Sequence, residues 1–88
     1  MRDLPNSTHY LAIYREWRRL GEGPLRARGK VAFTIFHNAV SPAPGAHPPR
    51  NGDVRWAESF VKTLPARLRR KTLAYKLYVE NVLPMSPK

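Results

Sequence analysis

The feature that most constrains the fold is a pair of apolar repeats on either side of a Gly-Glu-Gly-Pro turn. Before the turn, aromatic and aliphatic side chains recur at helical spacing after Ser7, which is a favourable N-cap residue. After the turn, Pro24 suits the first position of a second helix, and the apolar residues that follow again recur about every 3.6 residues. We therefore expect helices over residues 8–20 and 24–40.

Residues 31–36 leave a choice between helix and strand. Their sequence, Val-Ala-Phe-Thr-Ile-Phe, is rich in β-branched and aromatic side chains, which suit a buried strand. Periodicity over the longer segment favours a helix, but periodicity alone does not separate a buried strand from a buried helix. The strand stays open as the alternative.

The second half of the chain begins with a proline-rich loop at residues 41–53. Four prolines and two glycines in this stretch disfavour regular structure and favour an extended connection. Asp53 then offers an N-cap to a third helix over residues 54–64, which Pro65 ends. A fourth helix is expected over residues 66–83.

The length of the chain indicates how many domains it forms, and its net charge indicates the class of partner that it binds. Its 88 residues predict one helical domain, residues 1–88, folded as a small three- to four-helix bundle with the proline-rich loop between its two halves. A domain of this size buries little more than roughly 60% of its unfolded surface, so we expect a partner to stabilise it. Sixteen Lys and Arg residues against six Asp and Glu give a formal net charge of +10. This charge favours an anionic partner such as RNA, an anionic membrane surface or an acidic protein.

Several functional classes are disfavoured. The chain has no cysteine, which excludes disulfides, thiolate metal sites and cysteine nucleophiles. Its longest apolar run, residues 31–36, is far shorter than the ~20 residues that cross a bilayer, and its first residues lack the apolar core of a secretory signal. His9, His37 and His47 do not cluster, and no catalytic motif is present. We expect no enzyme, no metal site and no cofactor of the chain's own.

The fourth predicted helix is the most basic part of the chain. Its Lys and Arg residues lie beside Tyr75 and Tyr78, a combination that neutralises phosphates and stacks on unpaired bases. Basic helix faces are also often simply solvated, and the tyrosines fit core positions equally well. With one residue of the proline-rich loop, the candidate nucleic-acid-binding residues are Arg50, Arg67, Arg69, Arg70, Lys71 and Lys76.

The first predicted helix resembles that of a known family. Its sequence at residues 11–20, Leu-Ala-Ile-Tyr-Arg-Glu-Trp-Arg-Arg-Leu, is similar to the opening helix of the LYR-motif family of mitochondrial proteins, in which a Leu-Tyr-Arg triplet lies in the first of three helices. Here Ile13 replaces the leucine. Residues 36–38, Phe-His-Asn, loosely resemble the Phe-x-x-Asn-like end of the family's second helix, with one residue fewer between Phe and Asn. The proline-rich loop is longer than the connection that the family uses.

The resemblance implies a non-catalytic adaptor or accessory subunit of a mitochondrial assembly, on the matrix side, that binds an acyl carrier protein. In such proteins the acidic helix of the carrier meets the basic first helix, and the acyl chain on its phosphopantetheine enters the space between the helices. The resemblance thus implies, as partner-binding residues, Tyr14, Arg15, Arg18, Arg19 and Phe36, with Phe36 lining the acyl path. The alternative is a supernumerary mitochondrial ribosomal protein whose basic helices contact ribosomal RNA.

Overall fold

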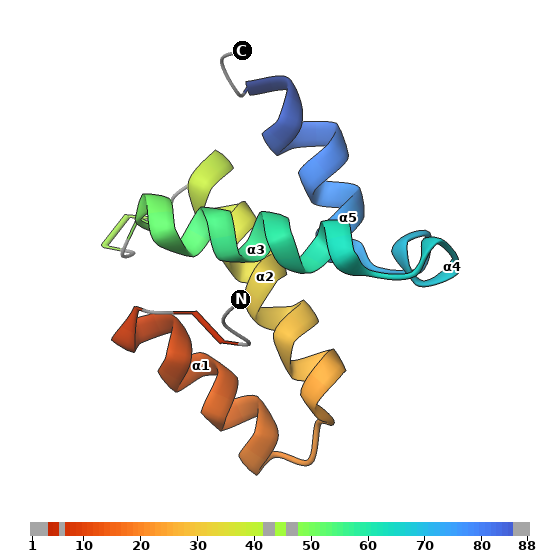
Figure 1. Cartoon of the computed structure of the whole chain (residues 1–88). Helices are drawn as coiled ribbons and strands as arrows, with labels where there is room; N and C mark the ends of the chain where they lie inside the picture. Colours follow the sequence, from red (N-terminus) through yellow and green to blue (C-terminus); the bar gives the residue numbers. More distant parts are fainter. Residues whose placement is uncertain (1–3, 6, 42–43, 46–47, 86–88) are drawn as a thin grey trace.

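Helix is the only regular secondary structure in the residues that the computed structural model describes, which are 4–5, 7–41, 44–45 and 48–85. This confirms the predicted all-α class, and Figure 1 shows how the helices are arranged. In chain order the elements are α1 (Thr8–Arg19), α2 (Pro24–Val40), α3 (Asn51–Thr63), α4 (Ala66–Arg69), α5 (Leu73–Leu77), a π-helical segment η1 (Tyr78–Val82) and a 3₁₀ turn η2 (Leu83–Met85).

The predicted hairpin of α1 and α2 is confirmed, and a glycine cap separates its two helices. Gly21 adopts a left-handed φ of 100°, which a residue without a Cβ reaches at little cost. Its N–H donates to the Arg18 carbonyl at 3.0 Å. The N–H of Glu22 donates to the Trp17 carbonyl at 3.1 Å. This pair of bonds is a Schellman cap, which ends α1 and allows the chain to reverse into α2.

α2 is the central helix of the structure. It is helical through residues 31–36, so the strand alternative is wrong. α1, α3 and α5 each pack against it, and Figure 1 shows α3 crossing it. The rings of Phe36 and Tyr78 lie 5.2 Å apart between centroids, which joins α2 to the C-terminal segment. The buried core contains Ala27, Val31, Ala32, Ile35 and Phe36 from α2, Tyr10 and Tyr14 from α1, Ala57, Phe60 and Val61 from α3, and Leu64, Ala74, Tyr78 and Val82.

The third helix begins earlier than the sequence prediction placed it. Asp53 is not the N-cap residue; α3 starts at Asn51, and the N-cap position belongs to Arg50. The Asp53 side chain is only 2% exposed, and its Oδ2 accepts a hydrogen bond from the backbone N–H of Arg50 at 3.1 Å. A carboxylate at the third helical position therefore captures the N–H of the cap residue. This moves the end of the proline-rich loop back from residue 53 to residue 50.

The continuous helix predicted over residues 66–83 is wrong. α4 closes after a single turn, because the N–H of Lys71 and the hydroxyl of Thr72 both donate to the Leu68 carbonyl, at 3.1 Å and 2.6 Å. Thr72 itself has extended backbone angles, φ −100° and ψ 118°. The break redirects the chain so that it packs against α2 from α5 onward.

After this break the chain follows a regular burial pattern. Ala74, Tyr78 and Val82 are buried and lie four residues apart, so they share one face of the segment formed by α5 and η1. That face covers α2 on the side away from α1, as Figure 1 shows. Ala74, Tyr78 and Val82 reach α2 only after the chain changes direction, so the segment does not continue α4 as one unbroken helix.

Replacing each of two glycines in the hairpin with alanine should change the stability of the fold in opposite directions. Gly21 requires a left-handed φ, so Gly21→Ala should destabilise the fold by about 1 kcal/mol. Gly29 lies inside α2, where an added Cβ meets no heavy atom within 4 Å, so Gly29→Ala should stabilise the fold by about 0.8 kcal/mol. Urea unfolding followed by circular dichroism measures both changes, and shifts of the same sign in both variants would contradict the account.

Candidate functional site

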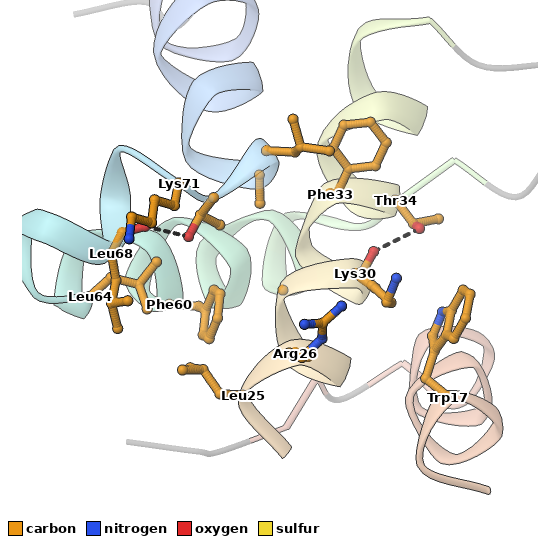
Figure 2. Close-up of a pocket in the computed structure, with 14 residues that line it drawn as sticks. Trp17, Leu25, Arg26, Lys30, Phe33, Thr34, Phe60, Leu64, Leu68 and Lys71 are labelled. Carbon is orange, nitrogen blue, oxygen red and sulfur yellow. Dashed lines mark hydrogen bonds between the residues drawn. The ribbon is translucent and has the colours of Figure 1, made fainter. Parts of the chain in front are cut away.

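A groove of about 590 Å³ lies along one side of α2, between α1 and the segment from the end of α3 to α5 (Figure 2). Figure 2 shows Trp17 of α1 on one side of α2, and Leu64, Leu68 and Lys71 on the other. The lining residues are Trp17, Leu25, Arg26, Gly29, Lys30, Phe33, Thr34, Phe60, Leu64, Leu68, Lys71, Thr72, Leu73 and Ala74. Its volume lies within the range of small-molecule sites, which is about 300–1,000 Å³.

Two rows of α2 side chains form the centre of the groove. Leu25, Gly29 and Phe33 lie four residues apart and make an apolar row. The adjacent row has the same spacing and contains the cationic Arg26 and Lys30. An apolar row beside a cationic row suits a molecule with an apolar chain and an anionic group.

The apolar lining is partly open to solvent. Leu25 is 47% exposed and Leu73, across the groove on α5, is 69% exposed. Large aliphatic side chains at such exposure favour contact with another apolar group, because water is released when they are covered.

The cationic lining is held in place by neighbouring side chains. Lys30 Nζ lies 4.5 Å from the centroid of the Trp17 ring, a cation–π contact that links α2 to α1. Arg26 Nε donates to Glu22 Oε1 at 2.9 Å. Lys71 contributes a third positive charge from the turn between α4 and α5.

The predicted partner-binding arginines lie on the exposed surface of α1, and none of them lines the groove. Arg18 Nη1 donates to the hydroxyl of the buried Tyr14 at 3.2 Å, so Tyr14 lies beneath this surface. Arg19 pairs with Glu16, and its hydrogen bonds hold the pKa of the Glu16 carboxyl below its usual value. Arg15 is exposed and makes no side-chain hydrogen bond to a described residue. We call Arg15, Arg18 and Arg19 the α1 basic face.

Phe36, the fifth predicted partner-binding residue, lies elsewhere. It is fully buried, packs against Tyr78 and does not line the groove. Phe33, three residues earlier, is the α2 phenylalanine that lines it. The sequence contained a signal for this residue, because Leu25 and Phe33 are apolar positions outside the stripe that α2 buries.

The candidate nucleic-acid-binding residues separate into two places. Arg67, Arg70, Lys71 and Lys76 are exposed around the break between α4 and α5. Arg69 is half-buried there. Arg50 precedes α3, whereas the others follow it, so a helix of 13 residues, about 20 Å long, lies between them. The structure does not bring Arg50 together with the rest.

Metal binding and membrane spanning find no support in the described part of the chain. Among these residues no group of three or more His, Cys, Asp or Glu side chains is placed to hold a metal ion. His47 lies outside the described residues. No described helix combines the length and apolarity that a bilayer crossing requires.

Comparisons with known proteins leave the family open. No protein-family model matches the chain, and no curated protein or solved structure shows significant similarity to it. The resemblance to the LYR-motif family therefore stays a prediction, and a function must be argued from the groove and the charged surfaces.

The groove should bind a small apolar anion such as 1-anilinonaphthalene-8-sulfonate. Because Leu25 and Leu73 are exposed, replacing both with Gln should leave the fold intact and weaken dye binding on the order of fivefold. A matched control replaces two exposed apolar residues outside the groove, Leu20 and Val79, with Gln. Fluorescence titration measures the affinity, and an equal loss in both double variants would show that the dye does not occupy the groove.

Proposed function

We propose that this protein is a non-catalytic adaptor of a mitochondrial matrix assembly that binds an acyl carrier protein. In this proposal the acyl chain of the carrier occupies the groove, and the acidic surface of the carrier lies on the α1 basic face. The proposal is supported by the contribution of one helix to both features. α1 carries the three arginines and also contributes Trp17 to the lining of the groove.

Apolar burial is the main source of affinity in this proposal. The row of Leu25, Gly29 and Phe33 provides a track along which an extended acyl chain can lie. Each buried methylene contributes about 0.8 kcal/mol, so a chain that buries about ten of them gains about 8 kcal/mol before the cost of association is subtracted. Covering Leu25 and Leu73 adds to this gain.

Charge selects the partner and orients it. Arg15 and Arg18 are available to carboxylates on the partner, whereas Arg19 is partly occupied by Glu16. The phosphate of phosphopantetheine is a further anion, for which Lys30 and Lys71 in the groove are suitable partners. Such contacts mainly speed association and fix orientation.

The proposal predicts separate effects of acylation and of charge on binding to a purified acyl carrier protein. The wild-type chain should bind the long-chain acylated carrier at least about tenfold more tightly than the carrier without phosphopantetheine. Arg15→Glu with Arg18→Glu should weaken binding of the acylated carrier by at least about tenfold, because both side chains then repel the acidic surface. Isothermal titration calorimetry gives the dissociation constants.

The matched control for charge is Arg67→Glu with Arg70→Glu. It lowers the net charge by the same amount at exposed residues that do not line the groove, so its affinity should stay within about twofold of wild type. Equal losses in the two double variants would overturn the assignment of the α1 basic face. Equal binding of acylated and unmodified carrier would overturn the assignment of the groove.

A further inference from the structure

We infer that the exposed basic residues around the break between α4 and α5 form a second binding surface, which takes single-stranded RNA; Lys71 of this surface also lines the groove. We call residues 66–76 the basic corner. Between Glu58 and Glu80 the chain has no acidic residue, so no carboxylate of this stretch offsets the positive charge there. The basic residues of the corner are Arg67, Arg69, Arg70, Lys71 and Lys76.

The fold concentrates this charge at one end of the molecule. Figure 1 shows α4 projecting past the crossing of α2 and α3. Arg67, Arg70 and Lys71 are three and four residues apart, and residue 70 keeps helical backbone angles, so their side chains share one side of this turn. All three are exposed. A strand of closely spaced phosphates fits such a cluster better than an isolated carboxylate does.

An aromatic ring at this corner lies close to Arg69. Arg69 Nε donates to the Leu64 carbonyl at 2.9 Å, which anchors its guanidinium. The Arg69 Cζ atom lies 5.9 Å from the centroid of the Tyr75 ring. Tyr75 is half-buried, which leaves part of it accessible to solvent. Guanidinium and phenol groups held side by side offer stacking surfaces for unpaired bases.

The short helices at this corner favour RNA over a membrane. α4 and α5 have four and five residues, whereas helices that lie in a membrane surface need an extended apolar face. Leu73, the most exposed large apolar residue near the corner, lines the groove.

The test is fluorescence anisotropy of the full chain with a labelled 20-nucleotide single-stranded RNA over a range of salt concentrations. If Arg67, Arg70, Lys71 and Lys76 each neutralise one phosphate, the logarithm of the association constant should fall by about 3 per tenfold rise in salt. Arg67→Glu with Arg70→Glu should weaken binding by at least about tenfold and reduce this slope by about 1.4.

The control is Arg15→Glu with Arg18→Glu, which removes the same charge from α1 and should change RNA affinity by less than about twofold. Tyr75→Leu should weaken binding about fivefold, and Tyr75→Phe should retain it, because only the ring is needed for stacking. Circular dichroism checks that each variant is folded.

Equal losses of RNA affinity in the two charge variants would mean that binding depends only on net charge. This result would overturn the assignment of the basic corner as a site. Binding to vesicles containing anionic phospholipid that depends on Arg67 and Arg70, without binding to RNA, would replace RNA by a membrane surface. Because the charge variants also separate carrier binding from RNA binding, failure of one proposal leaves the other intact.

Discussion

Packing against α2 holds the other helices of this small fold together. The buried residues of α2 include Ala27, Val31 and Ile35, and α1, α3 and α5 are each held in place by contact with it. A chain of 88 residues has too few elements to cover a central helix on every side. The uncovered side contains the row from Leu25 to Phe33, so the groove follows from the small size of the fold together with apolar residues where a surface helix would be polar.

The surface around α1 and the basic corner differ in their content of acidic residues. On α1 and at the start of α2, Glu16 and Glu22 form exposed ion pairs with arginines, which contribute little to stability and moderate the positive charge. The basic corner has no acidic residue. A surface that carries both acidic and basic side chains suits an acidic protein that must be oriented. A surface with basic side chains alone suits the repeated negative charges of a nucleic acid. This contrast supports two partners of different chemistry on one small scaffold.

Local sequence signals predicted the first half of the fold and little of the candidate site. Helical periodicity, Pro24 and the glycine turn were enough to place α1 and α2, because each signal acts within a few residues. The break after Arg69 was missed because it arises from tertiary packing: Ala74 and Tyr78 must reach α2. The groove was missed for the same reason, since the partial exposure of Phe33 and the full burial of Phe36 depend on which sides of α2 are covered.

A nuclear magnetic resonance titration of the ¹⁵N-labelled chain with acylated acyl carrier protein would show whether the carrier occupies the groove and the α1 basic face together. Backbone amides report contact residue by residue, and Gly29 gives a signal from the middle of the groove. The account predicts shifts at Arg15 and Arg18, and at Gly29 and its neighbours in the groove, with Arg67 and Arg70 unchanged. An unshifted Gly29, or shifts at Arg67 and Arg70 with none at Arg15 and Arg18, would contradict it.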